Sequence, residues 1–316
     1  MPFANAKLND GNEIPTIAFG TGSVNKGKDV SGIVTLALEA GFEHLDTAQI
    51  YGTETTMGKA IYESGLARSE LYITSKYWRG DAQDALKESL EKVFGYALRS
   101  APTHEWQLKI NYLDLYLIHS PRLVSDVESV WRGFEQAKAS GLTKSIGVSN
   151  FDLPQLQSLV KIARVLPSVN QISFSPYNYT QLKPLLEFSA KHKIVTAAYS
   201  SLAPITRYPG GPVDAPVAAA AKRLGISPTQ VIFLWVKSKG VIVVTTSSSK
   251  AHMEEYLAVG DLPSLTEEEI AAIDAAGANG PPSSLTLKAK RLRPVQVILP
   301  SLLLAILWFA NWRWFS

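Results

Sequence analysis

Three side chains that could move a proton lie close together in two short stretches of the chain. Asp46 and Tyr51 fall within residues 41–52, and Lys76 falls within residues 73–78. A hydride can add to a carbonyl carbon only when the oxygen is protonated, and a tyrosine can supply that proton when a cation lowers its high intrinsic pKa. A lysine ammonium group is such a cation. The combination indicates the reduction of carbonyl compounds.

These side chains need a scaffold that brings strand ends together, and the chain alternates strand-like with helix-like segments. The predicted strands span residues 16–19, 44–46, 71–75, 113–118, 143–148, 168–172, 194–199 and 242–245. The predicted helices span residues 30–40, 53–64, 82–93, 126–140, 153–163, 181–192, 216–238 and 250–259. Eight such pairs indicate an α/β fold, the (β/α)8 TIM barrel, whose functional side chains gather where the strands end.

Six polar residues fall at these predicted strand ends, and they have complementary chemistry. They are Asp46, Lys76, His119, Asn150, Gln171 and Tyr199. One further helix is predicted over residues 266–276, because Thr266 and Glu269 form a capping-box pattern. We therefore place the barrel domain at residues 1–276 and a linker with a basic flank at residues 277–294.

Composition excludes several classes of function. The 316 residues include no cysteine, so disulfides, thiolate metal sites and cysteine nucleophiles are absent, and no metal site is predicted. The net charge of +3 comes from five basic residues beyond Asp274. Without them the chain has 26 basic and 28 acidic residues, so we expect no nucleic-acid partner.

The C-terminal segment is predicted to anchor the protein in a membrane. Residues 295–310 contain only two polar side chains, Gln296 and Ser301, and tryptophans at 308, 312 and 314 would form an interfacial belt. Basic residues just before it favour the cytoplasmic side. The predicted span is 295–312, a C-terminal hydrophobic helix that tail-anchors a monomeric barrel on the cytosolic side of the endoplasmic reticulum. The alternatives are a helix lying in the interface, an extension packed on the barrel, or an oligomerisation element.

From residue 7 to residue 276 the chain resembles the aldo-keto reductase superfamily. Four motif positions carry the resemblance, and they match here as Asp46, Tyr51, Lys76 and His119. The resemblance implies that Tyr51 protonates the carbonyl oxygen, that Lys76 lowers the tyrosine pKa and that Asp46 holds the lysine. It also implies that His119 orients the carbonyl, with Trp78 beside it in the substrate pocket. The substrate would be a small aldehyde or ketone.

The resemblance also implies a nicotinamide cofactor, held by positions that match the contacts of this family. They are Gly20, Thr21, Asp46, Ser149, Asn150, Gln171, Tyr199, Ser200, Leu202, Thr245, Thr246, Ser247, Ser249, His252 and Glu255. The family usually has a lysine and an arginine at the positions of Thr246 and His252, where they recognise the adenosine 2′-phosphate. NADPH is the expected cofactor, and NADH stays open.

Two further expectations follow from the comparison with this family. The chain is about ten residues longer than usual between residues 91 and 113, and residues 94–107 are expected to form a surface loop or an added turn without chemistry. Some barrels of this family serve as channel β-subunits that bind cofactor and partner with little turnover, which is the alternative function. The intact set of four catalytic positions favours an enzyme.

Overall fold

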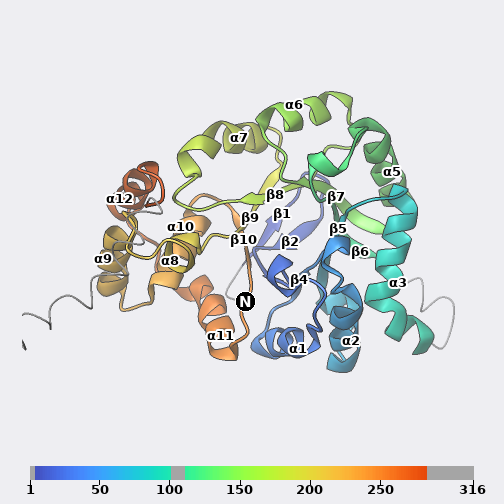
Figure 1. Cartoon of the computed structure of the whole chain (residues 1–316), viewed down its shortest axis with the longest axis horizontal. Helices are drawn as coiled ribbons and strands as arrows, with labels where there is room; N and C mark the ends of the chain where they lie inside the picture. Colours follow the sequence, from blue (N-terminus) through green and yellow to red (C-terminus); the bar gives the residue numbers. More distant parts are fainter. Residues whose placement is uncertain (1–3, 101–110, 283–316) are drawn as a thin grey trace, which may run out of the picture.

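The computed structural model describes residues 4–100 and 111–282, and its centre is a closed barrel of eight parallel strands (Figure 1). The strands are β3 (Ile17–Gly20), β4 (His44–Asp46), β5 (Tyr72–Tyr77), β6 (Leu113–Ile118), β7 (Thr143–Ser149), β8 (Val169–Ser173), β9 (Val195–Tyr199) and β10 (Ile242–Thr245). They pair in chain order, and β10 closes the barrel against β3. The predicted (β/α)8 barrel is confirmed, with each strand within two residues of its expected bounds.

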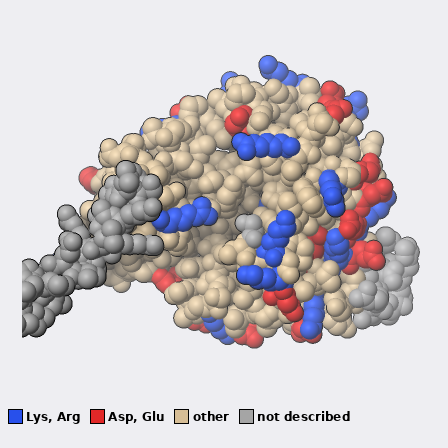
Figure 2. Space-filling view, viewed as in Figure 1, with Lys and Arg blue, Asp and Glu red and all other residues tan. Residues whose placement is uncertain are grey.

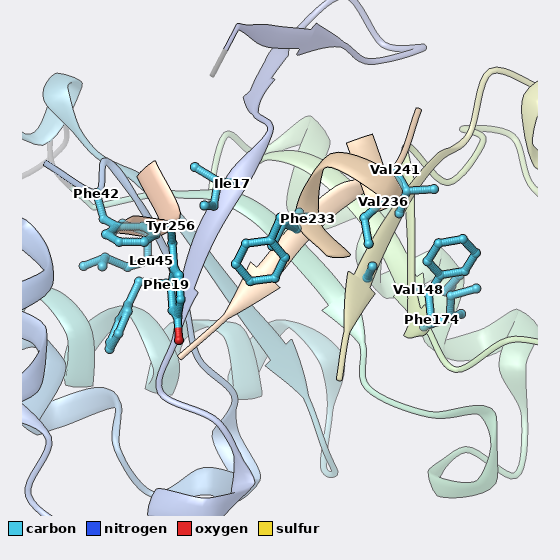
Figure 3. Close-up of a cluster of buried hydrophobic side chains, with 14 of the residues drawn as sticks. Ile17, Phe19, Phe42, Leu45, Val148, Phe174, Phe233, Val236, Val241 and Tyr256 are labelled. Carbon is cyan, nitrogen blue, oxygen red and sulfur yellow. The ribbon is translucent and has the colours of Figure 1, made fainter. Parts of the chain in front are cut away.

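Helices surround the barrel and cover the outer face of its strands (Figure 1). They are α1 (Ser31–Ala40), α2 (Glu54–Ser64), α3 (Ala82–Ser100), α5 (Val127–Ala139), α6 (Leu153–Ile162), α7 (Tyr179–Lys191), α8 (Ala203–Thr206), α9 (Asp214–Leu224), α10 (Pro228–Ser238), α11 (Lys250–Ala258) and α12 (Glu267–Ala278). Figure 3 shows part of the apolar layer between strands and helices, where Phe19 and Leu45 pack with Phe42. Burial of this apolar layer supplies most of the driving force for folding.

Side chains alternate between the two faces of each strand, so every second one points into the barrel. On β5, Ile73 and Tyr77 pack outward in the layer under the helices, whereas Tyr72 packs inward. Lys76 lies four residues after Tyr72, so the period of two places it on the inner side as well. Asp46 reaches the same level on β4, where it is paired in register with Thr74. Inward-facing positions near the ends of β4, β5, β7, β8 and β9 are therefore polar, whereas β3 and β10 place Gly20 and Val244 there.

A short antiparallel hairpin closes the end of the barrel at which the strands begin. It consists of β1 (Asn5–Lys7) and β2 (Glu13–Pro15), which the sequence pattern did not predict. Leu8 and Ile14 are 4% and 1% exposed, and they pack against the inward-facing side chains of the barrel. Asn12 ties the hairpin to β7 by donating to the Lys144 carbonyl at 3.1 Å. The other end of the barrel stays open.

The predicted helix over residues 216–238 is wrong, because the structure divides it into α9 and α10. Gly225 ends α9 with φ of +67°, a left-handed conformation that favours glycine. Ser227 then starts α10 with a capping box to Gln230. Gly225 is a typical signal for the end of a helix, and Ser227 with Gln230 is a typical signal for the start of one.

The surface loop predicted from residue 94 is also wrong for its first part. Helix α3 continues to Ser100, and Phe94 is 2% exposed. Leu86, Leu90 and Val93 precede it at helical spacing in the same core, so the apolar face of the helix simply continues. Residues 101–107 of the expected loop lie outside the described residues.

The predicted membrane anchor, residues 295–312, and most of the predicted linker also lie outside the described residues. Within residues 4–100 and 111–282, no helix combines the length and the apolar composition needed to cross a bilayer. The last described helix, α12, ends at Ala278.

Replacing Gly58 by alanine is expected to lower the free energy of unfolding by about 2 kcal/mol. Helices α2 and α3 pack so closely there that an added Cβ would lie 2.2 Å from the Val93 carbonyl oxygen. The backbone of one helix would have to move. Thermal unfolding should show a melting temperature lower by about 4 °C or more.

The control is Gly32→Ala in the exposed part of α1, where an added Cβ meets nothing within 4 Å. This variant should be neutral or more stable by up to about 1 kcal/mol, because alanine favours the helix. Equal stability of both variants would contradict the tight packing of α2 on α3.

Candidate active site

A pocket of about 560 Å³ lies where the barrel strands end. It is lined by inward-facing residues at the strand ends, among them Gly20, Asp46, His119, Gln171 and Tyr199. The first segment after β4 adds Tyr51, and the segment after β9 adds residues 200–203. Figure 2, which has the same view as Figure 1, shows this face of the molecule hollowed towards its middle. The predicted strand-end residues thus share one pocket.

An ion pair between Lys76 and Asp46 forms the floor of the site. Lys76 Nζ lies 2.5 Å from Asp46 Oδ1 and also donates to the Thr47 carbonyl at 2.9 Å. Both residues are almost fully buried, at 1% and 2% exposure. Burial alone would lower the pKa of Lys76, but the Asp46 carboxylate raises it above its usual 10.5. The lysine therefore keeps its charge at neutral pH.

Tyr51 stands above this pair at the end of a short 3₁₀ turn, η2 (Gln49–Tyr51). Its ring centroid is 5.4 Å from Lys76 Nζ, and it meets the His119 ring edge-to-face at 5.4 Å. Two contacts fix the turn. Gly27 N donates to the Tyr51 carbonyl at 2.8 Å, and the Gln49 amide oxygen accepts from Trp78 N at 3.0 Å. The phenol is thus placed by the loops that follow β3, β4 and β5.

Burial has the largest effect on the pKa values of Tyr51 and His119, the two groups above the ion pair. It raises the pKa of the Tyr51 phenol above 10.0, while Lys76 opposes this rise and Asp46 adds to it. Lys76 thus acts on the tyrosine pKa in the expected direction, but burial outweighs its effect in this structure. Desolvation and the Lys76 charge lower the pKa of His119 to about 4. At neutral pH Tyr51 carries its proton and His119 is neutral.

A second group of polar side chains lies across the pocket from Tyr51. Ser149 donates to the Gln171 carbonyl at 2.7 Å, and the Gln171 amide nitrogen donates to Asp46 Oδ2 at 2.8 Å. The Tyr199 hydroxyl donates to the Asn150 amide oxygen at 2.7 Å. Asn150 has φ of +62°, a left-handed conformation rare for residues with a side chain. The network joins the cofactor positions expected on β7, β8 and β9.

Trp78 follows β5 beside the site and is flanked by two cations. Arg79 lies 4.4 Å and Lys26 lies 5.9 Å from the indole ring. The Trp78 backbone N donates to the Gln49 amide oxygen at 3.0 Å, and Gln49 lies in the same 3₁₀ turn as Tyr51. Trp78 is thus tied through Gln49 to the turn that carries Tyr51, but it is not among the residues that line the pocket.

The structure does not bring every predicted cofactor residue to the wall of the pocket. Thr245 and Thr246 line it, whereas the Ser247 hydroxyl bonds to the backbone of Ser249 in the next loop and Ser249 Oγ accepts from His252 N at the start of α11. Thr21 is fully buried behind the wall, and its hydroxyl bonds to those of Thr47 and Thr53 at 3.2 and 3.0 Å.

The last two predicted contacts lie on helix α11. The His252 ring stacks on Tyr256, and Glu255 accepts a hydrogen bond from the hydroxyl of Ser227, the N-cap of α10. The side chain of Glu255 thus fixes the junction of two helices.

The sequence reasoning missed several wall residues, among them Arg207 in the segment after β9. Ser201, in the stretch 199–202 that the family resemblance places over the cofactor, also lines the pocket. Ser201 is 3% exposed, and its hydroxyl has no hydrogen-bond partner among the described residues. The sequence shows that Arg207 lies seven residues after Ser200, but this spacing does not reveal that the loop brings Arg207 back to the pocket.

The arrangement can protonate an oxygen placed above the ion pair. The phenol of Tyr51 makes no hydrogen bond among the described residues, so its proton is free to be given. The Nδ1 atom of His119 is buried without a partner. A neutral imidazole beside a protonated phenol can hold a carbonyl by hydrogen bonding without competing for its proton.

Comparison with known sequences agrees with this chemistry. The sequence model described as "Aldo/keto reductase family" matches residues 16–278. The NAD/NADP-dependent indole-3-acetaldehyde reductase of Schizosaccharomyces pombe is 37% identical over 260 residues, which cover 78% of this chain and 86% of that protein. The NADPH-dependent alpha-keto amide reductase of Saccharomyces cerevisiae is 34% identical over 298 residues, 88% of this chain and 92% of that protein.

Solved structures agree as well. The aldo-keto reductase of Bombyx mori in complex with NADP superposes with a TM-score of 0.74 at 32% identity, covering 86% of this chain and 92% of the other. The Brucella melitensis aldo/keto reductase has a TM-score of 0.71 at 35% identity, covering 87% of this chain and 99% of the other.

Proposed function

This chain belongs to the aldo/keto reductase family, and we propose that it reduces small aldehydes or ketones to alcohols with NADPH, Tyr51 being the general acid. The observation that carries the proposal is the buried Asp46–Lys76 ion pair directly beneath a protonated phenol in an open pocket. A protein that only bound a cofactor would not need this buried charge pair next to an unpartnered acid. The reductases named above support the same reaction class.

Each of the four residues has a separate part in this mechanism. Tyr51 holds the proton and gives it to the carbonyl oxygen, and His119 orients that oxygen through its ring nitrogen. Lys76 stabilises the tyrosinate that remains, because its charge lowers the pKa of the phenol. Asp46 keeps Lys76 in place and charged. NADPH, when bound, would supply the hydride.

The residues present suit a nicotinamide cofactor in this pocket. Amide groups of Asn150 and Gln171 and the hydroxyl of Ser149 offer the donors and acceptors that a carboxamide needs, and Tyr199 offers a flat aromatic face. The unpartnered Ser201 hydroxyl is a further donor. The relatives named for NADPH or NADP support NADPH as the main cofactor. Because Thr246 and His252 replace the usual cations for the 2′-phosphate, we propose that NADH is also usable.

The test is oxidation of NADPH by the purified chain in the presence of methylglyoxal or an aromatic aldehyde, followed by its absorbance. Turnover with formation of the alcohol is expected. Tight NADPH binding without turnover of any aldehyde or ketone would instead favour the role of a cofactor-binding channel β-subunit. The same assay with NADH in place of NADPH gives the preference between the two cofactors, as the ratio of the two kcat/KM values.

In the reductive direction, kcat/KM is expected to stay within about twofold between about pH 6 and about pH 9. Tyr51 acts as an acid only below its pKa, which lies above 10.0, so its proton is retained throughout this range. His119, with a pKa of about 4, stays neutral. Initial rates in a constant-ionic-strength buffer series measure this. A sigmoidal step with its midpoint between pH 6 and 8 would contradict the neutral histidine.

We also propose that residues 295–312 anchor a monomeric barrel on the cytosolic side of the endoplasmic reticulum. The support for the anchor is the apolar composition of this segment and its basic flank. Flotation with phospholipid vesicles should recover the full chain but not a chain ending at Pro282. Full chains that form oligomers and do not float would favour an oligomerisation element.

A further inference from the structure

A second cavity opens at the same end of the barrel, beside the pocket of the candidate active site. The second cavity has a volume of about 700 Å³, and that pocket, the first cavity, about 560 Å³. We propose that the second cavity binds an uncharged, apolar substituent of the carbonyl substrate, such as an aromatic ring, while the carbonyl group itself lies beside Tyr51 and His119. This inference rests on the proposed function, because it names the class of substrate that the same site would take.

The two cavities share part of their walls. Asn150, Ser173 and Tyr199 line both of them. The Tyr199 hydroxyl donates to the Asn150 amide oxygen at 2.7 Å, so two of these three residues are joined directly. At this place the boundary between the cavities is therefore a single layer of side chains.

The end of β6 leads from the reacting groups to the second cavity. His119 lines the first cavity, and Ser120, the next residue, lines the second. Their Cα atoms are only about 3.8 Å apart, as in any pair of consecutive residues. The Asn150 amide nitrogen donates to the His119 carbonyl at 2.9 Å and lies at the same junction. A carbonyl group that His119 orients therefore has the second cavity within reach of its substituent.

The first cavity must also hold the cofactor. The positions expected to bind the dinucleotide line it from Gly20 on β3 to Thr246 after β10. A bound dinucleotide would occupy much of this volume and leave little of it to a bulky substrate. Of the expected cofactor positions, only Asn150 and Tyr199 line the second cavity, so its volume stays available.

The lining of the second cavity suits an uncharged apolar group. Apolar side chains from the loop after β7, the end of β8 and helix α7 form most of its wall, among them Phe151, Ile172, Leu182 and Leu185. The charged residues described in this wall are Arg122 and Asp152, one of each sign. Asp152 is already engaged as the N-cap of α6, where it accepts from Gln155 N at 2.9 Å. Cavities of this size with mostly apolar walls and a few polar groups are typical sites for small molecules.

The test compares the reduction of two α-dicarbonyl compounds by NADPH and the full chain. The substrates are 2,3-butanedione and 1-phenyl-1,2-propanedione, in which a phenyl group replaces one methyl group. The natural chain should reduce the phenyl compound with a kcat/KM at least about tenfold higher. Leu182→Trp, which fills part of the second cavity, should remove most of this preference and leave kcat/KM for 2,3-butanedione within about twofold. Gln181→Trp, at the exposed rim of the cavity, should act in the same direction.

Leu186→Trp is the matched control. Leu182 and Leu186 are both half-buried leucines of α7 that pack against the core. Leu186 lines a different cavity, at the end of the barrel where the strands begin. This variant should keep the preference for the phenyl compound. Thermal unfolding shows whether each variant is folded, and if Leu182→Trp is not, Gln181→Trp decides by the same criterion.

The outcomes separate this inference from the function on which it rests. Equal kcat/KM of the natural chain for the two compounds would overturn the inference and leave the reductase proposal intact. A folded Leu182→Trp that keeps the preference, or that loses the reduction of both compounds equally, would also overturn it. If the natural chain turned over neither dione and no other aldehyde or ketone, the proposed function itself would be refuted.

Discussion

Tyr51→Phe is expected to reduce aldehydes with kcat/KM about a thousandfold lower than the natural chain, while its affinity for NADPH changes by no more than about twofold. The substitution removes the hydroxyl group that gives the proton and keeps the ring against His119 and Lys76. Steady-state rates and calorimetric titration with NADPH measure the two quantities separately. A loss confined to the rate identifies the phenol as the acid.

Tyr112→Phe is the matched control for this variant. Tyr112 lies just before β6, at the closed end of the barrel, where its hydroxyl accepts a hydrogen bond from Lys144 at 3.4 Å. Loss of a hydroxyl there should leave the reduction rate within about twofold. If Tyr51→Phe kept its rate within about tenfold, another group would have to donate the proton, and the proposed mechanism would be refuted.

Lys76→Met is expected to lower kcat/KM by about 10²-fold to 10³-fold and to lower stability as well. The variant removes the charge that opposes the rise of the Tyr51 pKa and that would stabilise the tyrosinate. It also leaves the Asp46 carboxylate, 2% exposed, without its cation, which costs about 3–5 kcal/mol of folding free energy. In the reverse reaction the phenolate is the base, so alcohol oxidation should require a higher pH than in the natural chain.

The double variant Asp46→Asn, Lys76→Met separates chemistry from folding. Removing the carboxylate eliminates the unpaired buried charge, so thermal stability should largely return. The reduction rate should stay low, since the charge beneath Tyr51 is still missing. Recovery of the rate along with the stability would show that Lys76 has a structural role only.

The strands were predictable from the sequence because their apolar runs are bounded by polar residues and turns. Several strands end in an inward-facing polar residue, and this pattern predicted that Asp46, His119, Gln171 and Tyr199 share one pocket, as they do. Helix boundaries were less certain. The division at Gly225 and the extension of α3 to Ser100 both depend on local signals that a continuous apolar face obscured.

Other features of the site depend on long-range geometry that one-dimensional patterns do not contain. Arg207 reaches the pocket only because Ser200 adopts a left-handed conformation and α8 reverses the chain. The raised pKa of Tyr51 depends on how much water the surrounding loops exclude, which residue types alone do not determine. The hairpin of β1 and β2 has strands of three residues, too short for a clear alternating pattern.

That hairpin has an electrostatic consequence for the other end of the barrel. Leu8 and Ile14 close one end of the barrel, so within the described residues the pocket at the strand ends, which Tyr51 lines, is the side of the buried ion pair that faces solvent. Whatever occupies this pocket therefore sets the local dielectric constant around Asp46 and Lys76. A bound ligand that expels the last water molecules would strengthen the influence of the lysine on the phenol at the moment when a proton is to be given.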